Sequence, residues 1–193
     1  MSHPESSNQV HVGAVVPARK LATVAGDRIA VPDAELLTHL QFRRFAGCPV
    51  CNLHLRSMAR RHDEIVAAGV REVVVFHSSD DDLRTYVTDL PFALIGDPSR
   101  RLYKEFGVEA SPRSLLDPRA WWPIARSVLH ASAVVITRRG PLPPLKPPGG
   151  RFGLPGDFLL APDGQVLAAH YGSHADDQWS VDDLLRLVPT VRR

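Results

Sequence analysis

The amino-acid sequence predicts an α/β fold built around a parallel sheet. Three observations support this fold class. First, short apolar runs of strand length alternate with helical patterns over residues 21 to 106. Second, the central run of this series, residues 73 to 76, is apolar at every position. Third, the chain closes with a hairpin pattern and a helix. Because strands that alternate with helices pair in parallel through right-handed crossovers, the order β, α, β, α, β predicts a parallel sheet.

The composition is that of an ordinary soluble globular protein. The 193 residues are 44% apolar and 23% charged, and this length fits one domain. With 23 basic and 21 acidic residues the net charge is +2. A charge this small creates no strong field, so we expect neither nucleic acid nor anionic lipid as a partner.

The sequence contains no run of about 18 apolar residues, so we expect no membrane-spanning helix. Residues 1 to 8 lack the basic start and the apolar stretch of a secretory signal. We therefore expect a cytoplasmic protein. In that reducing compartment, two closely spaced cysteines are seldom a structural disulfide.

The first part of the chain predicts an arm, two short strands, a third strand and a helix. Residues 1 to 20 are polar and aperiodic, which predicts an extended or loose N-terminal arm before a domain of residues 21 to 193. Residues 21 to 32 indicate two short strands about a Gly-Asp turn. Residues 40 to 45 indicate a third strand, and the helical spacing that follows predicts one long helix capped near Gly69.

The middle of the chain supplies the alternating strands and helices of the sheet. Residues 73 to 76 (Val-Val-Val-Phe) are typical of a strand buried on both faces. Several N-cap candidates at residues 78 to 82 precede a second helix. Residues 92 to 96 indicate another strand, and residues 99 to 106 indicate a short helix.

Residues 110 to 150 interrupt this alternation. Residues 115 to 129, which include Trp121 and Trp122, predict an apolar insert helix, and residues 141 to 148 predict a stiff polyproline-like tether. The insert is either a lid or interface or a helix packed on its own domain, because tryptophans at helical spacing are often core residues.

The end of the chain predicts a hairpin and a helix. Residues 157 to 161 and 165 to 171 read as two strands about a Pro-Asp-Gly turn. Ser180 is the expected cap of a final helix that runs to residue 188.

The two cysteines of the chain, Cys48 and Cys51, form a Cys-Pro-Val-Cys motif between a predicted strand and a predicted helix. Amide groups and the dipole at a helix N-terminus favour a thiolate, and thiols in such motifs have a pKa of roughly 3.5 to 7.5 instead of about 8.5. We expect an exposed Cys48 as the nucleophile and Cys51, one turn further on, as the resolving thiol within disulfide reach. Pro49 fits the first helical turn, where no amide donor is needed.

Arg43 and Arg44 stand a few residues before the motif. A guanidinium that turned back towards the sulfur would add positive potential there. Because side chains alternate along a strand, the two arginines point to opposite faces, and at most one should act on the thiol. The alternative is that both are surface arginines.

Two other interpretations of the cysteines remain open. Zinc binding needs about four ligands, and a second Cys-x-x-Cys is missing, although His54, His62 and His77 are available. The remaining interpretation is a pair of inert buried thiols. We assign no metal and no cofactor.

Several stretches together carry a resemblance to a known family: residues 42 to 51 around the dithiol, Gly69-Val70, residues 92 to 98, and residues 149 to 164. In these stretches the chain resembles the thioredoxin-like superfamily and, more narrowly, the peroxiredoxin-like branch of the alkyl hydroperoxide reductase and thiol-specific antioxidant (AhpC/TSA) proteins. The resemblance implies a thioredoxin-like fold with a central mixed sheet flanked by helices and an insert helix before the C-terminal hairpin.

The resemblance also implies further site residues. Pro155 stands where related redoxins place a cis-proline opposite the dithiol. Arg151 is the candidate for the arginine that peroxiredoxins hold near the attacking sulfur, with a solvent-exposed loop arginine as the alternative. Peroxiredoxins also carry Thr or Ser three residues before the attacking cysteine and Pro four residues before that, whereas this chain has Phe45 and Gln41. Peroxides and disulfides therefore both stay open as substrates.

Two classes of function follow. The first is a thiol-based oxidoreductase of the AhpC/TSA type, in which Cys48 attacks a peroxide or disulfide, Cys51 resolves the product, and an external thiol reductant such as a thioredoxin-like protein restores the dithiol without a bound cofactor. The second is a non-catalytic thioredoxin-fold binding or regulatory module whose 110 to 150 insert contacts a partner or, in a homodimer, its own symmetry mate.

Overall fold

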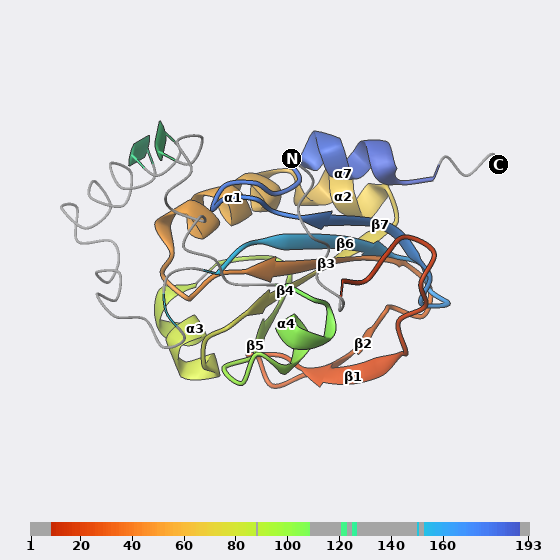
Figure 1. Ribbon diagram of the computed structural model, residues 1–193, viewed down its shortest axis with the longest axis horizontal. Coiled ribbons are helices and arrows are strands. Elements are labelled where there is room, and N and C mark those ends of the chain that lie inside the picture. Colours follow the sequence, from red (N-terminus) through yellow and green to blue (C-terminus); the bar gives the residue numbers. More distant parts are fainter. Residues whose placement is uncertain are drawn as a thin grey trace.

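The computed structural model describes residues 9 to 87, 89 to 108, 121, 122, 125, 126, 150 and 153 to 189. Within these residues a five-stranded sheet has the order β5-β4-β3-β6-β7, and a separate antiparallel hairpin consists of β1 (Arg19–Ala22) and β2 (Arg28–Val31) (Figure 1). Helices flank the sheet (Figure 1). The predicted α/β class is confirmed.

The five strands of the sheet are β3 (Leu37–Arg43), β4 (Val70–Phe76), β5 (Ala93–Gly96), β6 (Gly156–Leu160) and β7 (Val166–Tyr171). Strands β3, β4 and β5 are parallel, whereas β6 is antiparallel to both β3 and β7, so the sheet is mixed. The register pairs Arg43 with Phe76. Strands β3 and β4 therefore end at the same edge of the sheet, where ligand sites of α/β folds commonly lie.

The helices are α1 (Pro49–Arg60), α2 (His62–Ala67), α3 (Asp80–Tyr86), α4 (Arg101–Glu105) and α7 (Val181–Leu187). The prediction of a single long helix after the dithiol is wrong, because the helix is interrupted at Arg61, between α1 and α2. Arg61 has φ −115° and ψ 21°, its N–H donates to the carbonyl of Met58, and its own carbonyl accepts the amide of Glu64. A tightened last turn of α1 therefore becomes the start of α2.

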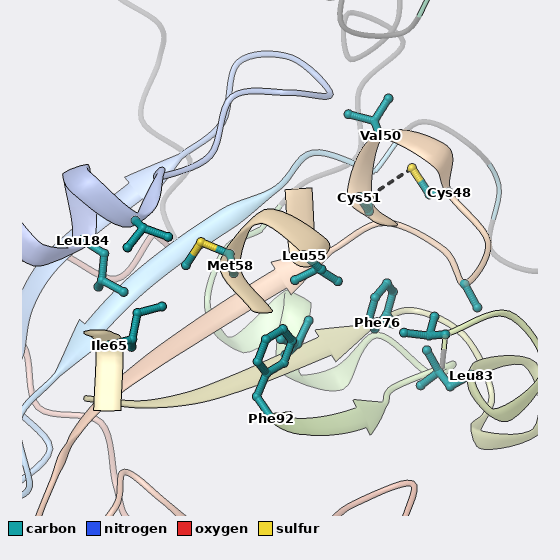
Figure 2. Packing of buried hydrophobic residues seen from close by; sticks show 14 of the residues in the cluster. Cys48, Val50, Cys51, Leu55, Met58, Ile65, Phe76, Leu83, Phe92 and Leu184 are labelled. Carbon is teal, nitrogen blue, oxygen red and sulfur yellow. Dashed lines mark hydrogen bonds between the residues drawn. The ribbon is translucent and has the colours of Figure 1, made fainter. Parts of the chain in front are cut away.

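Two apolar layers cover the two faces of the sheet. The first lies under α1, α2, α3 and α7 and includes Leu55, Met58, Ile65 and Leu184, whose side chains converge on the sheet in Figure 2. The second lies under the β1-β2 hairpin and α4. Strand β4 contributes to both layers because successive side chains alternate between faces, as its continuous apolar run predicts.

The described part of the N-terminal arm contains a turn at Val12 and Gly13 and is anchored to the sheet. The N–H of Gly13 donates to the carbonyl of Val166 (2.8 Å), and the N–H of Val16 donates to the carbonyl of Gly164 (2.9 Å). The side chain of Val16 is buried in the second apolar layer. Residues 13 to 16 therefore follow the turn between β6 and β7.

The predicted insert helix at residues 115 to 129 and the predicted tether at residues 141 to 148 lie outside the described residues, apart from four positions of the helix. Two of these four, Trp121 and Trp122, are exposed. Among the described residues no helix is both long and apolar enough to cross a membrane.

Candidate active site

The dithiol lies just beyond the end of β3, at the start of α1. Cys48 precedes the helix with extended backbone angles (φ −63°, ψ 115°), and Pro49 is the first helical residue. The carbonyl of Cys48 accepts the amide of Asn52 (2.9 Å), which forms the first turn. Proline suits this position because the first amides of a helix have no intrahelical acceptor. The motif therefore stands at the strand-to-helix boundary that the sequence predicts.

The two sulfur atoms face each other. The thiol of Cys51 donates to the Sγ atom of Cys48 across 3.0 Å, the contact drawn as a dashed line in Figure 2. Both cysteines are free thiols. Because a disulfide bond is about 2.05 Å long, a small side-chain movement would bring these atoms to bonding distance.

The surroundings lower the pKa of Cys48 to about 6. Burial opposes ionisation, but it is outweighed by the hydrogen bond from Cys51, the positive charge of Arg44, and the amide groups of Cys51 and Val50. Burial raises the pKa of Cys51, and the neighbouring Cys48 raises it further. At neutral pH the pair is therefore a Cys48 thiolate beside a Cys51 thiol.

The exposure of Cys48 differs from the expectation. The sequence predicts an exposed sulfur at the helix start, whereas Cys48 is 1% exposed. The cause is its apolar environment, since Cys48 belongs to the same buried cluster as Phe45 and Val50. In this structure the sulfur is therefore almost completely shielded from solvent.

Arg44 is the arginine that the structure places beside the sulfur. Its Nη1 atom lies 3.7 Å from the Sγ atom of Cys48, and its guanidinium carbon lies 5.5 Å from the centre of the Phe45 ring. Arg44 is itself buried, so its charge is weakly screened by water. This arrangement favours the ionised form of Cys48.

Arg43, the last residue of β3, makes a different set of contacts, as expected if at most one of the two arginines acts on the thiol. Its Nη2 atom donates to Oδ1 of Asp157 (2.7 Å) and to Oε1 of Gln41 (2.6 Å), and all three residues are fully buried. Arg43 therefore neutralises a buried carboxylate. Of the two arginines, Arg44 is the one that contacts the thiol.

This ion pair is part of a buried polar cluster that the sequence reasoning missed. It consists of His39, Gln41, Arg43, Glu72 and Asp157, which lie between the sheet and its covering helices. The Nε2 atom of His39 lies 3.2 Å from Oδ1 of Asp157, and the amide of Gln41 donates to Glu72 (3.0 Å). The available signal was in β3, where the polar residues His39, Gln41 and Arg43 occupy every second position of the strand.

Of the two loop residues that the resemblance implies, Arg151 lies outside the described residues, and Pro155 is buried directly before β6. The expectation of a cis bond before Pro155 is wrong, because the cis peptide bond of the described residues is Val31-Pro32. Pro155 instead continues the extended pairing of β6 with β7, in which its carbonyl accepts the amide of Gly172 (2.9 Å).

The three histidines considered as zinc ligands each have a different charged neighbour. His54 lies near Arg43 (3.4 Å), His62 near Glu72 (3.5 Å) and His77 near Arg100 (3.3 Å). Within the part of the chain that the structure describes, no three His, Cys, Asp or Glu side chains are grouped as a metal site requires. The described geometry therefore offers no support for the zinc interpretation.

A family model described as AhpC/TSA antioxidant enzyme matches residues 55–174. The matched range is more than half of the chain, and it begins after Cys51, so it does not include the dithiol itself. No curated protein matches the chain.

Solved structures resemble the chain over nearly its whole length. A cysteine-to-serine mutant of the peroxiredoxin 6 of Arenicola marina has a TM-score of 0.63 at 15% identity and covers 93% of this chain and 72% of its own. The peroxidoxin BcpB from Mycobacterium tuberculosis has a TM-score of 0.62 at 16% identity, with coverages of 94% and 98%. A putative thiol:disulfide interchange protein DsbE from Chlorobium tepidum has a TM-score of 0.58 at 17% identity, with coverages of 94% and 100%.

At such low identities the structural likeness shows the fold, which is thioredoxin-like with a mixed sheet flanked by helices. The family model supplies the closer relationship. By this match the chain belongs to the AhpC/TSA antioxidant enzymes, a peroxiredoxin-like family within the thioredoxin-like fold.

Proposed function

We propose that the protein is a thiol peroxidase that reduces small hydroperoxides, with Cys48 as the nucleophile and Cys51 as the resolving thiol. The observation that carries the proposal is the pair of sulfur atoms 3.0 Å apart at a helix start, one of them beside a buried arginine. The pKa of Cys48, about 6, leaves this thiol ionised at neutral pH. The thiolate is the form that attacks peroxides.

The reaction uses two protein thiols and one external reductant. The Cys48 thiolate attacks one peroxide oxygen, so that an S–O bond forms while the O–O bond breaks; Cys48 becomes a sulfenic acid, and the departing oxygen takes a proton from water. The thiol of Cys51 then attacks the sulfenic sulfur, a disulfide forms, and water leaves. An external dithiol supplies two electrons and two protons, which restore both thiols.

The burial of the nucleophile favours a peroxide over a protein disulfide as the first electrophile. Cys48 is 1% exposed. Thiol-disulfide exchange requires a partner sulfur to reach the thiolate and form a mixed disulfide with it. A hydroperoxide of a few atoms needs a much smaller opening.

Rapid mixing with hydrogen peroxide tests the proposal. We expect the wild type to react much faster than free cysteine, Cys48→Ser to lose the reaction, and Cys51→Ser to stop at the sulfenic acid, which dimedone traps. A wild-type rate equal to that of free cysteine, together with fast reduction of an oxidised protein substrate, would instead support a disulfide reductase.

The proposed cycle needs a thiol reductant and no bound cofactor, because the electrons move between sulfur atoms. We propose a cytoplasmic thioredoxin-like protein in this role. Peroxide-dependent consumption of NADPH in the presence of thioredoxin and its reductase tests that pairing. If thioredoxin does not support peroxide-dependent NADPH consumption but a low-molecular-weight thiol supports turnover, the reductant is a different one.

The second candidate function, a binding or regulatory module, is favoured by one specific observation. Trp121 is 61% exposed and Trp122 is 76% exposed, and exposed tryptophans are enriched at protein interfaces. The double variant Trp121→Ser with Trp122→Ser should lower the molecular mass in solution if this pair joins two copies of the chain. Unchanged mass and unchanged peroxidase rate would argue against an interface at these side chains.

A further inference from the structure

His77 carries a buried N–H group that has no acceptor among the described residues. The residue is 2% exposed, and its Nε2 atom makes no hydrogen bond to any residue that the structure describes. On the other side of the ring, Nη2 of Arg100 lies 3.3 Å from Nδ1. Because a guanidinium can only donate, Nδ1 accepts, and the ring proton is therefore assigned to Nε2.

The imidazole of His77 is neutral at physiological pH. Burial lowers its pKa to about 4, with further contributions from the positive charges of Arg100 and Arg44. A neutral ring whose Nδ1 is occupied can offer a single hydrogen bond, from Nε2. His77 can therefore donate a hydrogen bond from Nε2 but is not positioned to transfer a proton, so a substrate would take its proton from another source.

His77 is a neighbour of Arg44, the arginine that contacts the thiol, and both side chains approach Gly153. The backbone N–H of His77 donates to the carbonyl of Arg44 (3.3 Å). A Cβ atom built on Gly153 would lie 3.3 Å from Nε2 of His77 and 3.6 Å from Cγ of Arg44. The imidazole of His77 and the aliphatic part of the Arg44 side chain therefore both face Gly153. The far end of the Arg44 side chain lies 3.7 Å from the Sγ atom of Cys48.

Two aromatic rings pack against the imidazole of His77. Its edge-on neighbours are Phe45, with ring centres 6.5 Å apart, and Tyr103, with ring centres 5.8 Å apart. A buried donor without an acceptor destabilises a fold, so an unsatisfied one calls for an explanation such as a catalytic role. An oxygen atom of a bound substrate would supply the missing acceptor.

We propose that Nε2–H of His77 is the hydrogen-bond donor for one oxygen of the hydroperoxide, next to the Arg44–Cys48 pair. This inference rests on the proposed peroxidase function and names a group that binds its substrate. As the S–O bond forms and the O–O bond breaks, negative charge collects on the departing oxygen. The N–H group stabilises that charge until the oxygen takes a proton from water, and His77 keeps its own proton throughout.

The test compares His77→Phe with His77→Gln. Phenylalanine keeps the ring contacts and removes the donor, so Cys48 should react with hydrogen peroxide about 100- to 1,000-fold more slowly. Glutamine places an amide N–H near the former Nε2 position and should restore most of the rate. Alkylation of Cys48 by iodoacetamide, which needs the thiolate but no oxygen donor, should change little in either variant. The control is His170→Phe, because His170 is paired with Asp177.

Gly153→Ala supplies an independent variant that leaves His77 in place. Its added methyl group would meet Nε2 and cover the donor, so the peroxide rate should again fall while alkylation is preserved. This variant answers the question even if His77→Phe fails to fold.

The outcomes separate the inference from the proposed function. A fast wild type with unchanged peroxide rates in both His77→Phe and Gly153→Ala overturns the inference and leaves the peroxidase standing. Equal losses of the peroxide and iodoacetamide rates also overturn it, because His77 would then merely support the thiolate. A wild type no faster than free cysteine removes the proposed function, and the inference with it, before any variant is measured.

Discussion

The guanidinium of Arg44 lies 3.7 Å from the sulfur of Cys48, and neither residue is more than 3% exposed. A cation and a thiol this close, with little water between them, form a unit whose charge state depends on both partners. The thiol of Cys51, 3.0 Å from the same sulfur, adds the second stabilising contact.

The first prediction concerns the charge of Arg44. Arg44→Gln removes the cation that favours the thiolate, so the pKa of Cys48 should rise from about 6. We expect the midpoint of iodoacetamide reactivity against pH to move upwards by about one pH unit. Arg84→Gln is the control, because Arg84 is exposed and pairs with Asp81. An unchanged midpoint in Arg44→Gln would show that the helix amides and Cys51 alone set the ionisation.

The second prediction separates the hydrogen bond of Cys51 from its redox role. Cys51→Ser retains a hydroxyl donor, whereas Cys51→Ala has none, so the pKa of Cys48 should be higher in the alanine variant. Both variants lose the intramolecular disulfide. The pH dependence of Cys48 alkylation, measured in the two variants side by side, gives the difference. Identical profiles would mean that the 3.0 Å contact contributes nothing to ionisation.

The third prediction concerns the buried ion pair of Arg43 with Asp157. Asp157→Asn leaves the guanidinium without its carboxylate, and breaking a buried pair in this way costs about 3 to 5 kcal/mol of unfolding free energy. Urea denaturation measures the loss. Asp182→Asn is the control, because Asp182 is exposed and pairs with Arg61 at the surface. A loss below about 1 kcal/mol would show that the amide replaces the carboxylate in the cluster.

The same pair predicts how stability depends on pH. Burial raises the pKa of Asp157, but the charge of Arg43 and the hydrogen bond of His39 outweigh burial and hold it well below its ordinary value. The stabilisation is therefore fully present above about pH 4, the pKa of an unfolded Asp, and is lost as the pH falls further. Wild-type stability should fall more steeply below pH 4 than that of Asp157→Asn. Parallel curves in urea denaturation at several pH values would contradict this origin.

The fourth prediction compares two turn glycines with similar backbone angles. Gly164, between β6 and β7, has φ +90°, and Gly26, between β1 and β2, has φ +98°. A Cβ on Gly164 would lie 2.3 Å from the carbonyl oxygen of Val16, whereas a Cβ on Gly26 would meet nothing within 4 Å. Alanine should cost about 1 to 2 kcal/mol at Gly26 from backbone strain alone, and clearly more at Gly164.

Hydrogen exchange shows where the extra cost at Gly164 arises. The amide of Val16 is bonded to the carbonyl of Gly164, so its protection should fall in Gly164→Ala and stay normal in Gly26→Ala. Equal exchange at Val16 in the two variants would mean that the N-terminal arm is not held by this turn.

Much of the fold could be predicted because its signals are local. The apolar run of β4 indicates burial on both faces, and Ser79 and Ser180 accept hydrogen bonds from amides in the first turns of α3 and α7. The break at Arg61 could not be predicted, because the apolar spacing continues across it. Its side chain pairs with Asp182, which lies 121 positions further along the chain.

The candidate site likewise has features that follow from local sequence and features that depend on long-range contacts. The Cys-x-x-Cys spacing and the strand-to-helix boundary suffice to bring two thiols together at a helix start. Side-chain alternation predicts that at most one of Arg43 and Arg44 acts on the thiol. The choice between the arginines depends on Asp157, 114 positions away in the chain, which β6 carries to Arg43.

The sequence by itself determined the strands of the sheet, their order and the dithiol between a strand and a helix, because each of these depends on a few neighbouring residues and their backbone. The tertiary structure alone decided that Cys48 is buried, that Arg44 is its cation, and that His77, whose Nε2 has no hydrogen-bond partner among the described residues, is a neighbour of that arginine. Strand order and helix packing bring these groups together, and such long-range contacts leave no periodic trace in the chain.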